Sequence, residues 1–205
     1  MPHLRSPLRA AVGLLVCSSS LFTLAACAQH APSPDVHADH MSTAAAASTS
    51  SSPDDPSLPA GSAGVAQRLA GSPRHGEYVM VPTGPGDSVR AWVVYPERST
   101  KAPVVVVIHE IFGLSTWVRG VADQLAADGY IAIAPDLLTG KATPAPGTDT
   151  LTQAIATSTI RTLKPGDVQR QLAAVGAYGM SLPAAERSYG VVGFCWGGGT
   201  SFARC

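Results

Sequence analysis

The sequence predicts an α/β fold with a mainly parallel sheet and helices on both faces of that sheet. Two observations carry this prediction. From about residue 73 onward, short apolar runs alternate with stretches of helical periodicity. One of these runs, PVVVVIH at 103–109, is a continuous β-branched segment of the kind that is buried on both sides in a parallel sheet.

The predicted strands and helices follow one another along the chain. The ranges 77–82 and 89–95 are expected to form two strands joined by the turn-rich TGPGD, and 103–109 forms the third. Ser115 is a candidate N-cap for a helix that ends at Asp128-Gly129. The remaining elements are a strand at 130–135, helices at 151–163 and 167–178, and a strand at 189–194.

Residues 1–27 have the three parts of an export signal: a basic start, an apolar stretch at 10–26 and small residues at its end. The apolar stretch is interrupted by serines and is shorter than the roughly 20 residues that a spanning helix needs. Its end, Leu24-Ala25-Ala26-Cys27, resembles the lipobox of bacterial lipoproteins, in which the cysteine is lipidated. The resemblance predicts an exported protein anchored to a bacterial membrane through Cys27; a plain secretory peptide with a periplasmic product is the alternative.

Residues 28–72 are rich in Ala, Ser, Pro and Asp and almost devoid of large apolar side chains. Such a segment cannot bury enough surface to offset its ordering entropy, so we predict a disordered tether ahead of a domain at 73–205. His30, His37 and His40 lie in this tether. Their spacing lacks cysteine or carboxylate partners in a known arrangement, so we expect solvated histidines and no metal ion.

Charge and cysteine content exclude several classes of function. Lys and Arg number 14, as do Asp and Glu, and removing residues 1–27 with their two arginines leaves 12 − 14 = −2. No basic cluster is present, so nucleic acid is not an expected partner. Beyond Cys27 only Cys195 and Cys205 remain, which gives no disulfide framework, and nothing specific favours a bridge between them. The absence of a C-x-x-C motif argues against a thiol redox protein.

The segment Gly193-Phe194-Cys195-Trp196-Gly197 has the form G-x-nucleophile-x-G. In α/β-hydrolases the nucleophile stands on a sharp turn between a strand and a helix, where side chains in place of the flanking glycines would clash with neighbouring elements. Here an apolar strand precedes Cys195, and glycines at 197–199 let a helix begin close to the sheet. Cys195 is therefore the candidate nucleophile; a buried structural cysteine is the alternative.

A second candidate segment, HEIFG at 109–113, follows the PVVVVIH strand directly. In α/β-hydrolases this position supplies a backbone N–H to the oxyanion hole. Because successive side chains of an extended chain point to opposite sides, we expect a structural His109 rather than a His109, Glu110 and Cys195 site. Asp136 is a candidate triad acid, but a turn and capping role is expected.

Together HEIFG, the following helix, GYIAIAPDLL and GFCWGG resemble the dienelactone hydrolase family, also called carboxymethylenebutenolidases, of the α/β-hydrolase superfamily. The resemblance implies that Cys195 is the nucleophile and that Glu110 is a buried carboxylate that helps to activate the thiol; a solvated Glu110 is the alternative. It also implies that the backbone N–H groups of Ile111 and Trp196 bind the oxyanion. The implied reaction is hydrolysis of a small-molecule carboxylic ester or lactone through an acyl-cysteine, without metal or organic cofactor.

The last ten residues of the sequence lack two expected groups. In this superfamily the triad order is nucleophile, acid, histidine, yet no acid or histidine follows Cys195, and the last histidine is His109. We therefore expect a C-terminally truncated member with an incomplete sheet, inactive alone, in which 189–194 is an exposed edge strand. A non-catalytic lipoprotein that keeps the scaffold as a binding module is the alternative. Substrate identity and oligomeric state do not follow from the sequence.

Overall fold

The computed structural model describes residues 55–141, 148 and 151–202. The predictions for the export signal, for Cys27, for the linker histidines and for Cys205 lie outside these residues. None of the described helices combines the length and the apolar character that a membrane-spanning segment requires. The fold that follows is therefore that of the domain alone.

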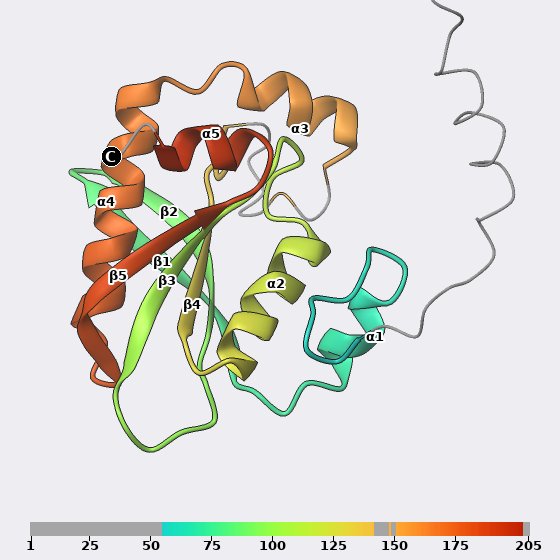
Figure 1. The fold of residues 1–205 in the computed structure, drawn as a ribbon. Coiled ribbons are helices and arrows are strands. Elements are labelled where there is room, and N and C mark those ends of the chain that lie inside the picture. Colours follow the sequence, from blue (N-terminus) through green and yellow to red (C-terminus); the bar gives the residue numbers. More distant parts are fainter. Residues whose placement is uncertain (1–54, 142–147, 149–150, 203–205) are drawn as a thin grey trace, which may run out of the picture. The chain divides into compact units, whose positions relative to one another are not determined.

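Five strands form one sheet in the order β1-β2-β4-β3-β5 (Figure 1). Strand β2 pairs antiparallel with both β1 and β4, whereas β3 pairs parallel with β4 and β5. Four of the five strands thus run in one direction, which confirms the predicted mainly parallel sheet, with β2 as the exception. The strands are β1 Gly76–Gly84, β2 Asp87–Val94, β3 Ala102–Ile108, β4 Ile131–Asp136 and β5 Ala185–Gly193.

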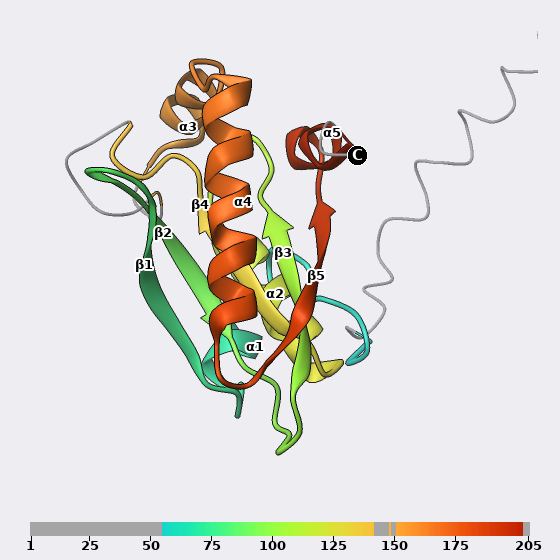
Figure 2. The same cartoon turned by 90° about the vertical axis from the view of Figure 1, so that its left-hand side faces the viewer.

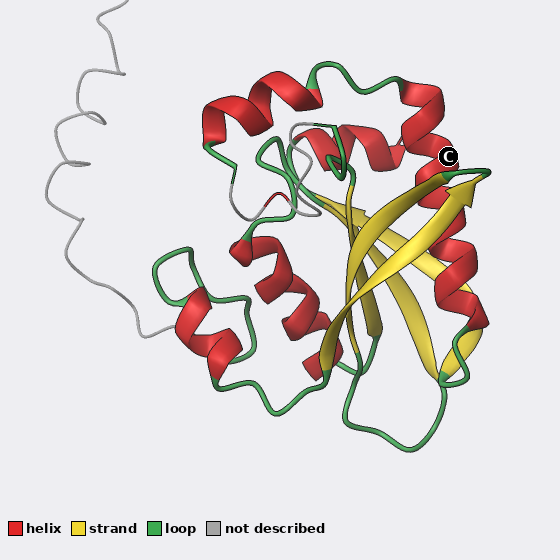
Figure 3. Cartoon of the chain, turned by 180° about the vertical axis from the view of Figure 1, so that it is seen from behind, coloured by secondary structure: helices red, strands yellow, loops and turns green. Residues whose placement is uncertain are grey.

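Helices cover both faces of this sheet, as predicted (Figures 2 and 3). Helix α4 packs against one face and α2 against the other, while α3 and α5 lie near the ends of the strands that lead into the candidate site. The helices are α1 Val65–Ala70, α2 Thr116–Ala127, α3 Gln153–Ile160, α4 Pro165–Ser181 and α5 Trp196–Phe202.

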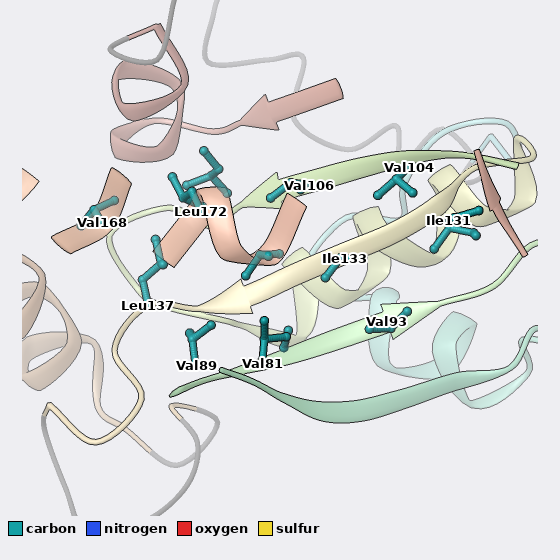
Figure 4. Packing of buried hydrophobic residues seen from close by; sticks show 14 of the residues in the cluster. Val81, Val89, Val93, Val104, Val106, Ile131, Ile133, Leu137, Val168 and Leu172 are labelled. Atoms are coloured by element: carbon teal, nitrogen blue, oxygen red, sulfur yellow. The ribbon is translucent and has the colours of Figure 1, made fainter. Parts of the chain in front are cut away.

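Strand β3 shows why a continuous apolar run forms the middle of the sheet. Val104 and Val106 pack in the same buried cluster as Leu172 of α4 (Figure 4). Val107 packs in the other cluster, which contains Val118 of α2. Because alternate side chains enter opposite cores, every position of the strand gains from being apolar. The β-branched run at 103–109 is therefore explained by burial on both sides.

Helix α2 begins and ends where the sequence predicts. The Ser115 hydroxyl accepts a hydrogen bond from the Val118 N–H at 3.3 Å, which satisfies one of the free donors at the helix start. At the other end Gly129 adopts φ +97°, a conformation that glycine enters without a Cβ clash. The chain then turns directly into β4.

Helix α1 corrects the boundary of the predicted tether. It lies within 28–72, the range expected to be disordered, yet Val65 is only 3% exposed and packs against Gly120 of α2. The Arg68 guanidinium also donates to the Leu58 carbonyl and so holds the preceding loop on the helix. The packed domain therefore includes residues 55–72, because one apolar side chain finds a fitted partner that composition alone does not reveal.

Strand β5 is the outer strand of the described sheet next to β3. Glu186, Arg187 and Ser188 are exposed, and Val191 and Val192 are only half-buried. The predicted edge position of this strand is confirmed for the described residues. Its last residues lead into the turn that carries Cys195.

Candidate functional site

Cys195 occupies a sharp turn between β5 and α5. Its φ of +53° is the only positive φ of a non-glycine residue in the described part of the chain. A side chain in this left-handed region costs about 1–3 kcal/mol, which the surrounding structure must offset. The thiol is free and exposed. The turn thus presents a strained, accessible cysteine, unlike the buried structural cysteine considered as the alternative.

The two glycines that flank this turn have no room for a side chain. A Cβ on Gly193 would overlap the carbonyl of Gly197. A Cβ on Gly197 would lie 2.5 Å from the Ile108 carbonyl oxygen and 2.6 Å from that of His109, both backbone atoms at the end of β3. The Phe194 N–H also donates to the Ile108 carbonyl at 3.3 Å. The turn is therefore pressed against the start of the HEIFG segment, as a nucleophile elbow requires.

The proposed oxyanion donors lie at the same edge of the sheet. Ile111 follows the end of β3, and Trp196 is the first residue of α5, where its N–H has no partner within the helix. Neither N–H donates to an acceptor among the described residues. Because β3 and β5 are parallel neighbours with Ile108 opposite Gly193, both segments leave the sheet on the same side. Two donors without a partner among the described residues thus follow the ends of neighbouring strands.

His109 is fully buried and bound to the backbone through both ring nitrogens. Nδ1 donates to the Glu110 carbonyl at 2.6 Å, and Nε2 accepts from the Leu137 N–H at 3.2 Å. The ring stacks on Trp196 with centroids 5.8 Å apart. Burial lowers the pKa of His109 to about 4, so the ring is neutral at pH 7. These contacts agree with the expected structural role and leave neither nitrogen for a His109, Glu110 and Cys195 site.

The neutral His109 should make stability depend on pH. Its folded pKa of about 4 lies below the usual 6.5, so its contribution is complete above pH 6.5 and is lost as the pH falls toward 4. We expect the free energy of unfolding, measured with urea, to fall with a slope that approaches about 1.4 kcal/mol per pH unit between pH 6.5 and 5. This slope corresponds to the uptake of one proton on unfolding. A His109→Gln variant should be less stable at pH 7 but show a flatter profile. Parallel profiles would contradict this account.

Glu110 is half-buried and lines a pocket of about 630 Å³. Burial raises the pKa of its carboxyl group above the usual value. Among the described residues no group donates to this carboxylate or pairs with it. The other lining residues come from the segment before α2, the start of α2, the loop after β4, and the starts of α3 and α1 with the residues just before α1; Cys195 is not one of them. The structure thus brings the backbones of the two candidates to one edge, with the Glu110 side chain directed into a neighbouring pocket.

The loop around the pocket depends on Asp136 and Thr148. Asp136 is fully buried, and its carboxylate accepts from the Leu138 N–H at 3.2 Å and the Thr148 N–H at 2.8 Å. The Thr148 hydroxyl accepts in turn from the Leu114 N–H at 3.0 Å. Asp136 therefore has the expected turn and capping role. Thr148, which links the loops after β3 and β4, was not predicted, because no motif surrounds it.

No three His, Cys, Asp or Glu side chains gather as possible metal ligands in the ranges described above.

The comparison with known families concerns most of the same domain. Residues 89–204 match the model of the dienelactone hydrolase family, a range that contains β3, HEIFG and the Cys195 turn. The chain belongs to the dienelactone hydrolase family.

Individual relatives of the family agree with this assignment. A carboxymethylenebutenolidase homolog of Xenopus tropicalis is 34% identical over 116 residues, which are 55% of this chain and 44% of the relative. The crystal structure of a dienelactone hydrolase-like promiscuous phosphotriesterase from metagenomic libraries superposes with a TM-score of 0.53 at 25% identity, covering 64% of this chain and 53% of that chain. Relatives from Salmonella typhi, Synechocystis and Escherichia coli match over 42%, 46% and 41% of their lengths. The chain therefore spans less than half of these curated dienelactone hydrolase relatives.

Proposed function

We propose that this chain carries the nucleophile-bearing part of a hydrolase that cleaves a carboxylic ester or lactone through an acyl-cysteine intermediate. The observation that carries the proposal is the backbone of Cys195, held at φ +53° between two glycines whose Cβ atoms would clash. A strained turn of this kind holds an exposed side chain at a fixed place, which a nucleophile needs. Membership of the dienelactone hydrolase family supports the same reaction class.

In the proposed reaction the Cys195 sulfur attacks the carbonyl carbon of the ester. A carbon–sulfur bond forms, and the carbonyl oxygen takes the negative charge and is stabilised by the N–H groups of Ile111 and Trp196. The oxyanion then collapses, the ester carbon–oxygen bond breaks, and the alcohol leaves with the proton that the thiol gave up. Water hydrolyses the thioester, which releases the carboxylic acid and restores the thiol.

Glu110 is the proposed acceptor of the thiol proton. Its burial raises its pKa toward that of a thiol, which makes the carboxylate a better base. Glu110 lines a pocket that Cys195 does not line, so its side chain would have to move toward the sulfur when substrate arrives. The acylation step as proposed uses no triad histidine or acid, since neither follows Cys195 in this sequence.

Acylation of Cys195 tests this proposal on the chain as it stands. We expect p-nitrophenyl acetate to transfer one acetyl group to Cys195, detected by intact mass and located by peptide mapping. The Cys195→Ala variant should gain no such group, and Cys205 serves as an internal control thiol. Acetylation of Cys195 no faster than that of Cys205 would contradict a nucleophilic role and favour a scaffold kept as a binding module.

Export and lipid anchoring through Cys27 remain part of the proposal. They are supported by the basic start, the apolar stretch and the Leu24-Ala25-Ala26-Cys27 motif. In this arrangement the hydrolase domain would lie outside the cytoplasm, at the membrane surface or in the periplasm. A small-molecule ester would then meet the enzyme in that compartment.

A further inference from the structure

The segment before the family-matched range has a defined place in the domain. The match to the dienelactone hydrolase family begins at residue 89, yet α1, which precedes it, packs against α2. Val65 fits against Gly120, where a Cβ would overlap the valine side chain, and Ala60 is only 2% exposed. Figure 1 shows α1 beside α2. This segment is therefore an ordered element that precedes the family-matched range.

Two residues of this segment form part of the pocket that contains Glu110. Ser62 and Val65 line it together with Phe112 and Trp117. Trp117 also makes an edge-to-face contact with Phe194, at 5.0 Å between centroids, and Phe194 precedes Cys195 directly. The pocket and the elbow are thus joined by one aromatic pair. A ligand group in the pocket could contact Trp117 and would then lie one side chain away from Phe194.

The lining of this pocket favours an uncharged ligand group. Among the described lining residues Glu110 alone has an ionisable side chain, and none is Lys, Arg or His. The other polar side-chain groups of these residues are four hydroxyls, one amide and the Trp117 indole N–H, which form hydrogen bonds without carrying charge. A carboxylate would lose its hydration there without gaining a cationic partner and would face the Glu110 carboxyl group.

We propose that Ser62 and Val65 determine the specificity of this site, by closing the pocket beside Glu110 around an uncharged, partly apolar group of the substrate. Val65 supplies an apolar surface that its own packing on α2 holds in place. Ser62 supplies a small hydroxyl at the mouth and so sets the width of the opening. The role of this pocket in substrate specificity rests on the proposed hydrolase function, but ligand binding to the pocket can be tested separately.

The test measures the binding of methyl phenylacetate and of phenylacetate to the full chain. A Cys195→Ala background prevents turnover, and titration calorimetry or ligand-observed NMR gives Kd. We expect the ester to bind at least about 10-fold more tightly than the acid. Ser62→Trp should weaken ester binding at least about 10-fold, because the indole would fill the mouth of the pocket. Ser62 is exposed, so the domain should still fold, which the melting temperature would verify.

Gln67→Trp is the matched control, because Gln67 is exposed on α1 and does not line the pocket. It should leave ester binding unchanged. Equal binding of acid and ester, or an unchanged Kd in Ser62→Trp, would overturn the inference even if Cys195 is acylated. Loss of ester binding in Ser62→Trp alone would support the inference even if acylation fails, in which case only the proposed function would fall.

Discussion

Gly197→Ala is expected to destabilise the domain by about 3 kcal/mol, a large share of the stability of a typical domain. The new Cβ would lie 2.5 Å from the Ile108 carbonyl oxygen and 2.6 Å from that of His109. Both are backbone atoms at the end of β3, in the middle of the sheet, so neither can move aside without distorting a strand. Urea unfolding monitored by circular dichroism would measure the difference.

The neighbouring Gly199 provides the control for this prediction. It lies in the same helix α5 and is exposed, and a Cβ there would meet nothing within 4 Å. Gly199→Ala should therefore be neutral or stabilise the chain by up to about 1 kcal/mol through helix propensity. Equal destabilisation by the two substitutions would show that α5 is not pressed against β3, and the elbow geometry would then be wrong.

The same elbow shows why part of this site could be predicted from sequence. A turn that has no room for side chains two residues before and two residues after the nucleophile must have glycine at both positions. Five consecutive residues therefore predict its geometry. The Ser115 cap and the β-branched run of β3 are equally local, since each pairs a residue type with one conformation or one environment. Such local patterns can be recognised without knowledge of the rest of the fold.

Helix α1 and the role of Thr148 could not be predicted because each depends on contacts with residues far away in the sequence. Val65 is one apolar residue among small and polar ones, and its burial depends on the absence of a side chain at Gly120, far along the chain. Thr148 matters because its hydroxyl and N–H join Leu114 to Asp136. Neither contact produces a periodic pattern, so composition indicated a tether for the first, and no motif marked the second.

Glu110→Gln is expected to slow the acetylation of Cys195 by about 100-fold, the lower end of what a positioned base contributes. The amide keeps the size of the side chain but cannot accept the thiol proton. In the unsubstituted chain the rate should rise as the pH increases through the raised pKa of Glu110, because only the carboxylate accepts a proton. The variant should lack this rise, and stopped-flow acetylation between pH 4.5 and 8 would compare the two profiles.

Stability separates this role from a structural one. Burial disfavours the charged form of Glu110 in the folded state, so its folded pKa lies above the unfolded value and its ionisation opposes folding at neutral pH. Glu110→Gln should therefore melt at the same temperature as the parent chain or higher while it reacts more slowly. Glu97→Gln, which changes an exposed acid in the same way, should alter neither property. If Glu110→Gln reacts as fast as the parent, Glu110 is a solvated acid at a strand end, and Cys195 must lose its proton to water or to another group.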